Sequence, residues 1–196
     1  MISRRPFAII SMISRGTLSR DGFRFELHPC ETGASAGLYE AADESPGSVA
    51  TWMAWLHEGY SLKDAQDWAA RAVEAWEAGR EYEFVIVDRD DGRVAGACGL
   101  NQINPKDCFC NLGYWVRESK RRLGAATQAA LLAKEFGLKV LGLNRVEIVV
   151  AVGNEASRRV AEKTGAIYEG ILRRRTKVGD KVHDSHMYAF IQGSRV

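Results

Sequence analysis

A basic turn between a strand-forming run and an alanine-rich helix carries the residues best suited to chemistry. Arg121 and Arg122 can form charge-assisted hydrogen bonds, and small residues from Gly124 onward let an anion approach the main chain. The first N–H groups of a helix lack partners and the helix dipole is positive there. The pattern therefore predicts a phosphate-binding turn. Its candidate residues are Val116, Arg121, Arg122, Leu123, Gly124, Ala125, Ala126 and Thr127.

The two commoner phosphate signatures are missing from the sequence. No Gly-x-x-x-x-Gly-Lys-Ser/Thr loop occurs, and no Gly-x-Gly-x-x-Gly turn opens a helix. A basic loop before a helix can also be an ordinary solvated turn. The turn by itself leaves both interpretations open.

Two segments resemble motifs of the GNAT N-acetyltransferases. The Arg-x-x-Gly-x-Ala spacing of residues 121–126 resembles the pyrophosphate-binding motif of that family. Residues 154–157 follow a β-branched run and resemble the Asn-x-x-Ser element of the family. The resemblance implies acetyl-CoA, and hence coenzyme A, as the cofactor.

Two further segments resemble the RimJ/RimL branch, whose enzymes acetylate the N-termini of ribosomal proteins. Residues 52–55 resemble its Trp-x-Pro-Trp segment, with Ala54 in place of the proline. Residues 170–188 resemble its C-terminal hairpin in order and approximate spacing. The four segments occur in the family's order and cover most of residues 23–191.

The resemblance implies that two central strands splay apart and hold the cofactor. The strand that ends at Val116 and the one that begins at Arg145 would present unpaired main-chain groups to the pantetheine arm. Asn154 would bond that arm or hold the helix entry, and Ser157 would lie near the sulfur. A plain N-cap is the alternative role for Asn154.

The implied reaction is attack of a neutral amine on the acetyl thioester, followed by departure of the thiolate. The main-chain N–H near Val116 is the expected oxyanion donor. Ser157 is the expected acid, with Tyr188 as a second candidate. A covalent acyl-enzyme is not expected, because no Cys–His–Asp order supports one.

The general base is less clear from the sequence. Many relatives place a glutamate before the Gly-Tyr-Trp segment, where this chain has Asn111. Glu147 is the remaining candidate, acting through a water, and an ordinary solvent-facing strand residue is its alternative. Deprotonation by solvent is a third route, because a free α-amine has a pKa of ~8.

The acceptor side is the least diagnostic part of the sequence. The resemblance implies that Trp52 and Trp55 border the acceptor pocket, and Asp184 serves the hairpin or lines the cleft. Four nearby carboxylates either attract a cationic amine or form a solvated helix surface. These carboxylates are Glu40, Asp43, Glu44 and Glu58.

Three functions follow from these features. The leading hypothesis is acetylation of the N-terminal α-amine of a protein. A small amine such as an amino acid, a polyamine or an antibiotic is the alternative acceptor. The third hypothesis is a noncatalytic module that binds RNA or the ribosome through basic residues. Those residues are Arg117, Lys120, Arg121, Arg122 and Arg173 to Arg175.

Composition favours one domain with a full core. The 196 residues are 46% hydrophobic and 27% charged, with a net charge of +2, so direct binding of nucleic acid is not expected. Four scattered cysteines predict reduced thiols and a cytoplasmic location. The spacing of His183 and His186 puts them on opposite strand faces, so no metal site is expected. No membrane partner is expected either, and the resemblance implies a monomer or homodimer.

The pattern of elements predicts an α/β (α+β) class with the GNAT fold. The expected sheet is mixed and mostly antiparallel, with about six to seven strands, splayed central strands and flanking helices. Residues 1–20 are expected to be an N-terminal extension rather than a signal peptide, and residues 21–196 a single domain. Expected strands cover residues 23–27, 84–87, 94–100, a run up to 116, and 145–152. Expected helices cover 33–42, a segment up to 56, 61–79, a helix from 124, and 154–165.

Overall fold

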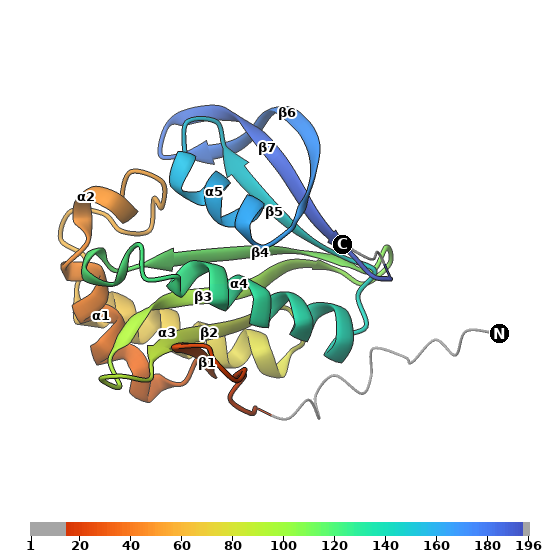
Figure 1. The fold of residues 1–196 in the computed structure, drawn as a ribbon. Helices are drawn as coiled ribbons and strands as arrows, with labels where there is room; N and C mark the ends of the chain where they lie inside the picture. The colour runs from red at the N-terminus through yellow and green to blue at the C-terminus, as the bar shows by residue number, and fades with distance from the viewer. Residues whose placement is uncertain (1–14, 194–196) are drawn as a thin grey trace.

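The computed structural model describes residues 15–193, which form one seven-stranded sheet in the order β1-β2-β3-β4-β5-β7-β6 (Figure 1). The β4–β5 pair is parallel, and the other neighbouring pairs are antiparallel. This arrangement confirms the predicted fold class. The strands are β1 (Phe25–Pro29), β2 (Tyr82–Asp88), β3 (Val94–Asn104), β4 (Phe109–Val116), β5 (Arg145–Ala151), β6 (Ile167–Val178) and β7 (Lys181–Ile191).

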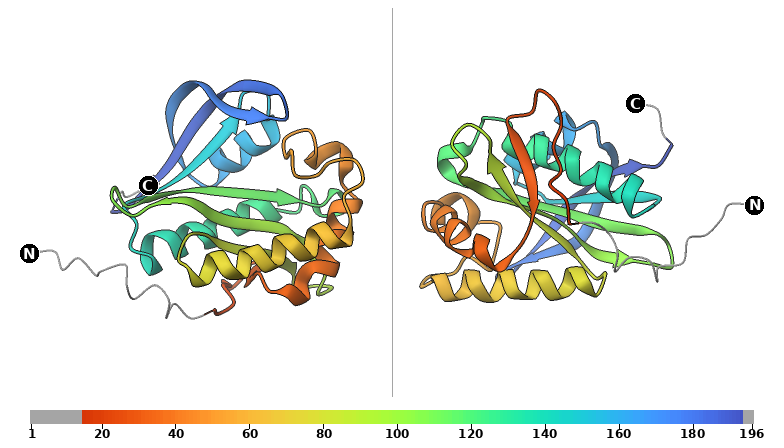
Figure 2. Two further views of the ribbon diagram at one scale, coloured as in Figure 1. Left: turned by 180° about the vertical axis from the view of Figure 1, so that it is seen from behind. Right: turned by 90° about the horizontal axis from the view of Figure 1, so that it is seen from below.

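Helices cover both faces of the sheet. In the views of Figure 2, α3 lies on one face and α4 on the other. Small side chains such as Ala69 and Ala72 let α3 lie close to Val85 of the sheet. The helices are η2 (Thr32–Ala34), α1 (Ser35–Asp43), α2 (Pro46–Val49), α3 (Leu62–Glu77), η3 (Glu118–Lys120), α4 (Ala125–Glu135), the π-helix η4 (Phe136–Val140) and α5 (Glu155–Lys163).

Strands β4 and β5 pair only at one end. The parallel register runs from Phe109 opposite Arg145 to Asn111 opposite Glu147, and no pairing follows beyond that point within the described chain. Figure 1 shows the two strands separating, with α5 beside the gap. This geometry confirms the predicted splayed central strands.

Main-chain groups of both strands face this gap. The Arg117 N–H donates to the Ala95 carbonyl at 2.8 Å, so by alternation Tyr114 and Val116 point their main-chain groups away from β3 and toward β5. On the opposite strand, the Val152 N–H donates to the Asp184 carbonyl of β7 at 2.8 Å, so by alternation the main-chain groups of Val149 face β4. The gap can therefore accept a polar, extended ligand.

The segment after α2 differs from its prediction. The sequence predicted helix up to Leu56, whereas α2 ends at Val49 and residues 50–60 form turns. The chain turns because Leu56 packs back against Val49 and Ala42 in a small apolar cluster. The tertiary packing thus outweighs the helical spacing of these residues.

Part of the predicted N-terminal extension packs on the sheet. Leu18 exchanges main-chain hydrogen bonds with Leu27 of β1, and Arg20 forms an ion pair with Glu135. The other residues of that prediction, 1–14, lie outside the described residues. Across residues 15–193, none of the helices has the length and apolar character needed to cross a bilayer.

Candidate active site

The predicted phosphate turn leads directly into α4. Gly124 is the N-cap residue at φ +89°, a left-handed conformation that favours glycine. The cap has no side-chain hydrogen bond, and the first turn of α4 has no acidic residue. The first N–H groups of the helix are therefore free to bind an anion. Arg122 and Leu123 are exposed beside them.

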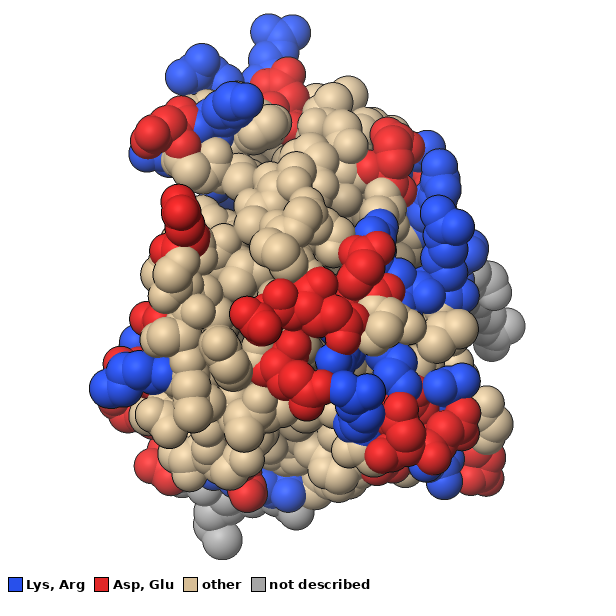
Figure 3. Space-filling model, turned by 90° about the vertical axis from the view of Figure 1, so that its left-hand side faces the viewer, with Lys and Arg blue, Asp and Glu red and all other residues tan. Residues whose placement is uncertain are grey.

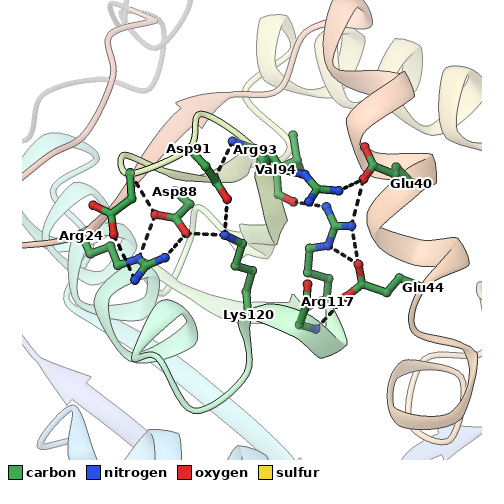
Figure 4. A network of polar contacts seen from close by, with 11 residues as sticks. Arg24, Glu40, Glu44, Asp88, Asp91, Arg93, Val94, Arg117 and Lys120 are labelled. Atoms are coloured by element: carbon green, nitrogen blue, oxygen red, sulfur yellow. Dashed lines mark hydrogen bonds and ion pairs between the residues drawn. The ribbon is translucent and has the colours of Figure 1, made fainter.

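A buried arginine fixes the start of this turn. Arg117 is 2% exposed, and its guanidinium donates to the Val94 carbonyl at 3.1 Å, to Glu40 at 3.0 Å and to Glu44 (Figure 4). Glu44 also accepts the Ser119 N–H at 2.6 Å. The bonds from Arg117 lower the pKa of Glu44 to about 2. The turn is thereby fastened to α1.

A buried lysine fixes the turn to the β2–β3 hairpin. The Lys120 Nζ donates to Asp88 at 2.7 Å and to Asp91 at 2.5 Å, and Asp88 is fully buried. Arg24 forms two further hydrogen bonds with Asp88, at 2.9 and 2.7 Å (Figure 4). Arg24, and then Lys120, hold the pKa of Asp88 well below its usual range.

These two networks change the interpretation of several charged residues. Glu40 and Glu44 are neither an amine attractor nor a plain solvated surface, because both hold Arg117. Arg117 and Lys120 are buried in ion pairs, so they are unsuited to bind RNA phosphates. Arg121 is exposed and pairs with Glu118 at 3.0 Å.

The start of α5 brings Ser157 close to β4. Asn154 caps the helix, and its side chain accepts the Ser157 N–H at 3.1 Å, so the N-cap role expected as an alternative is present. The Tyr114 hydroxyl donates to the Ser157 carbonyl at 3.1 Å and lies 3.1 Å from the Ser157 Oγ. Ser157 therefore stands across the gap from β4.

Three other candidate residues have partners elsewhere. The Tyr188 hydroxyl lies 3.4 Å from a carboxylate oxygen of Glu162 on α5. Glu147, at the last paired position of β5, accepts a hydrogen bond from Arg145 at 2.6 Å. Asp184 accepts the main-chain N–H of Arg174 at 2.8 Å and so braces the β6–β7 hairpin.

The two candidate tryptophans lie at the open end of the gap. The Trp55 ring packs 5.3 Å from that of Trp115 on β4. The Trp52 ring lies 5.9 Å from that of His183 on β7 and beside Gly153, which follows β5. Residues 50–60 therefore contact both β4 and β7. Figure 3 shows acidic side chains in the middle of this side of the molecule, basic ones beside them and uncharged surface above.

A polar strip on the α3 face was not predicted from the sequence. Glu83 of β2 lies opposite Gly99 of β3, which lies opposite Gly113 of β4. Next to this row, the Asn111 side chain donates to Asn101 at 2.9 Å. The sequence feature that could have pointed to this strip is an acidic residue within an otherwise apolar strand, at a position that alternation turns toward the interior.

Three of the four cysteines have no reactive setting. Cys30, Cys98 and Cys110 are buried, and burial raises the pKa of the Cys30 and Cys110 thiols to about 12. These three thiols therefore serve packing. Residues 15–193 contain no cluster of three or more His, Cys, Asp or Glu arranged to hold a metal ion.

A groove of about 440 Å³ lies at the other end of α4. It includes Lys134 and Lys139 near the end of α4 and Ala189 to Gly193 at the end of β7. These residues adjoin the paired end of β4 and β5 rather than the gap, so the groove is separate from the candidate site.

Comparison with known proteins assigns the family. A family model described as an acetyltransferase (GNAT) domain matches residues 24–167, most of the chain. The chain belongs to this family. The GNAT assignment agrees with the resemblance of residues 121–126 and 154–157.

Relatives of this GNAT chain include ribosomal-protein acetyltransferases. YdaF of Bacillus subtilis is 32% identical over 102 residues, 52% of this chain and 56% of YdaF, so the chain spans about half the length of that relative. The ribosomal-protein-serine acetyltransferase of Escherichia coli is 26% identical over 170 residues, 87% of this chain and 94% of that protein.

A solved structure shares the fold. RimL, a ribosomal L7/L12 alpha-N-protein acetyltransferase in complex with coenzyme A, superposes with a TM-score of 0.82 at 20% identity. The match covers 90% of this chain and 98% of RimL. The prediction of coenzyme A as the cofactor agrees with that ligand.

The site of this chain fits coenzyme A. Tyr114, Val116 and Val149 offer main-chain groups to the two amides of a pantetheine arm. The uncapped start of α4 at Gly124 suits a pyrophosphate. The strand gap and the helix start are joined by the turn that Arg117 and Lys120 fix.

Proposed function

We propose that this chain is an acetyl-CoA-dependent N-acetyltransferase that modifies the N-terminal α-amine of a protein. The observation that carries the proposal is the gap between β4 and β5, which leads through a fixed turn onto the uncapped N-terminus of α4. The match over 170 residues to a ribosomal-protein-serine acetyltransferase supports a protein acceptor. The reduced, buried thiols agree with a cytoplasmic location.

Bound acetyl-CoA supplies a thioester, and residues of the chain act around it. In this proposal the Val116 N–H donates to the oxygen that gains charge during attack. Ser157 is the proton donor to the departing thiolate, and Tyr114 holds its hydroxyl toward the gap. Trp52 and Trp55 form the wall past which the acceptor enters.

The test is release of free thiol from acetyl-CoA across a panel of N-terminal peptides and small amines, with coenzyme A binding measured by calorimetry on the same sample. Turnover on peptides that begin with serine or alanine supports the proposal. Turnover on small amines alone would show that the acceptor is a small amine and not a protein N-terminus. Absence of both binding and turnover would overturn the proposal.

A pair of variants tests the role of Ser157. Ser157→Ala should lower kcat tenfold or more and leave the dissociation constant of coenzyme A within about threefold, because a lost proton donor affects the chemical step. Ser157→Thr keeps a hydroxyl and should recover part of kcat. Equal kcat in Ser157→Ala and the wild type would remove Ser157 from the mechanism.

A further inference from the structure

One carboxyl group on the α3 face has no role in the proposed function so far. Glu83 lies on β2 with its side chain directly over Gly99 of β3. A Cβ added to Gly99 would lie 1.9 Å from the Glu83 Oε2 and 2.2 Å from its Cδ. Glu83 keeps partial accessibility, whereas Tyr82 and Phe84 on either side are buried.

In the row of residues that runs across the sheet from Glu83 toward the strand gap, the next two positions are glycines, which carry no side chain. Gly99 and Gly113 lie in register with Glu83 across three strands. Neighbouring strands are about 4.8 Å apart, so the carboxyl group over β3 lies one strand spacing from β4, and the gap lies beyond β4. The two glycines thus place no side chain of their own between the carboxyl group and the gap, and the Asn101 Nδ2 lies 3.7 Å from where a Cβ on Gly113 would be.

Asn101 and Asn111 line the side of this Gly99–Gly113 path. The Asn101 Oδ1 accepts a hydrogen bond from Asn111, which leaves the Asn101 amide N–H groups for the Glu83 carboxylate. This arrangement orients Glu83 toward β4. The Asn111 amide cannot accept a proton from an ammonium group at neutral pH.

We propose that Glu83 is the base that removes a proton from the acceptor ammonium group, through water on the Gly99–Gly113 path. The inference rests on the proposed acetyl transfer. Glu147, the candidate predicted from the sequence, is less suited because Arg145 binds its carboxylate at 2.6 Å.

The proton transfer balances with the acetyl transfer. An N–H bond of the ammonium breaks, its proton passes to the Glu83 carboxylate, and the nitrogen keeps the electron pair. That pair forms the new C–N bond at the thioester carbon while the C–S bond breaks. A second amine proton passes to the thiolate sulfur by way of Ser157, and Glu83 returns its proton to solvent.

The electrostatic setting of Glu83 suits this role. Burial raises its pKa to about 7, the negative charge of Glu81 acts in the same direction, and Asn101 opposes both. The charge of Glu83 also acts on the buried Cys30 and Cys98 thiols, whose pKa it raises. A base whose pKa lies near the working pH is effective and largely regenerated after each turnover.

The first test compares Glu83→Gln with the wild type on the acceptor that the wild type acetylates fastest. We expect kcat/KM at pH 7.5 to fall tenfold or more, with the dissociation constant of coenzyme A within about threefold. The wild type should show an acidic limb near pH 7. In the variant, the rate should instead follow the neutral fraction of the amine, whose pKa is ~8.

A matched control and a second variant separate this role from a structural one. Glu81→Gln removes the neighbouring acid and should keep the acidic limb. Gly99→Ala should displace the carboxyl group, because the three atoms nearest the added Cβ all belong to the Glu83 carboxyl. Gly99→Ala should therefore lose activity as Glu83→Gln does, and combining the two should add no further loss.

The outcomes distinguish this inference from the proposed function. If the wild type turns over an amine while Glu83→Gln keeps its kcat/KM and its acidic limb, Glu83 is not the base and the proposed function stands. Additive losses in the double variant would also overturn the inference. A wild type without turnover on any amine would overturn the proposed function and this inference together.

Discussion

At the scale of residues, burial decides the role of the charged side chains around the turn. Arg117 and Lys120 follow β4 within four residues and resemble phosphate ligands in the sequence, yet both are buried in ion pairs. Arg121 and Arg122 are exposed beside the helix start. The first pair positions the turn, whereas Arg122 is exposed and Arg121 pairs with Glu118 at the surface.

Glu44→Gln should reduce stability in a pH-dependent way. Arg117 lowers the pKa of Glu44 to about 2 from its ordinary 4.5, so the ionised carboxylate stabilises the fold above pH 4.5. That contribution is lost as the pH falls toward 2. We expect a loss of about 1–2 kcal/mol at pH 7, discounted for partial exposure, that shrinks below pH 4. Urea unfolding at several pH values measures it, and a pH-independent difference would contradict it.

Glu83→Gln should have the opposite effect. The pKa of Glu83 is raised to about 7, so ionisation costs stability as the pH rises from about 4.5 through 7. The variant lacks this cost and should be more stable than the wild type at pH 8, by about 1–3 kcal/mol. Near pH 4 the two proteins should unfold alike. If the variant were less stable than the wild type at pH 8, the ionised carboxylate would be stabilised by its neighbours, and the prediction would be wrong.

At the scale of elements, the start of α4 and the start of α5 form the two sides of the site. Both helices begin at the open end of the strand gap, where β4 and β5 no longer pair. The first has no side-chain cap, whereas Asn154 caps the second. An uncapped start leaves N–H groups for a ligand, and a capped start holds Ser157 in place.

Gly124→Glu should abolish coenzyme A binding. The substitution adds a carboxylate where the turn would hold an anion, and it forces a side chain into a left-handed conformation. Gly124→Ala is the control, because it carries only the backbone strain of about 1–2 kcal/mol. Calorimetry should detect weakened binding for alanine and none for glutamate. Intact binding by Gly124→Glu would mean that the turn does not hold the cofactor.

Asn154→Ala should weaken both the helix and the reaction. The side chain accepts the Ser157 N–H at 3.1 Å, and loss of such a cap costs ~1 kcal/mol. Because Ser157 then loses its anchor, kcat should fall together with the thermal midpoint. Asn154→Asp preserves the acceptor and should restore both. If Asn154→Ala lowered the midpoint and left kcat unchanged, the cap would have no part in positioning Ser157.

At the scale of the whole molecule, the charge distribution favours a cofactor site over an RNA surface. Arg173, Arg174 and Arg175 are exposed on the hairpin, but Arg117 and Lys120 are withdrawn into the protein. The hypothesis of a noncatalytic module that binds RNA or the ribosome therefore loses part of the basic surface that it requires. The oligomeric state, the domain limits and the role of residues 1–14 stay predictions.

Ligand binding should separate the two molecular functions. We expect coenzyme A to bind at 150 mM salt and a generic RNA to bind weakly, with an affinity that falls steeply as salt rises. Isothermal calorimetry and fluorescence anisotropy at several salt concentrations measure the two. Tight RNA binding at 150 mM salt without coenzyme A binding would favour the noncatalytic module.

The local sequence predicted the parts of the site that are built within one segment. The phosphate turn, the Asn154 cap and the strand before Val116 depend on near neighbours, so composition and spacing suffice to find them. The helix predicted up to Leu56 was wrong because its apolar residues pack against α1 rather than along one helix face.

Contacts between distant segments decided the rest. The sequence could not show that Arg117 meets Glu44, 73 residues away, or that Glu83 lies over Gly99, because strand pairing and helix packing bring these residues together. The sequence by itself determined the family, the fold class and the helix that starts after Gly124, and the binding of the cofactor by this turn stays a prediction. Only the tertiary structure decided which charges are buried, because burial and ion pairing depend on neighbours that the chain order does not fix.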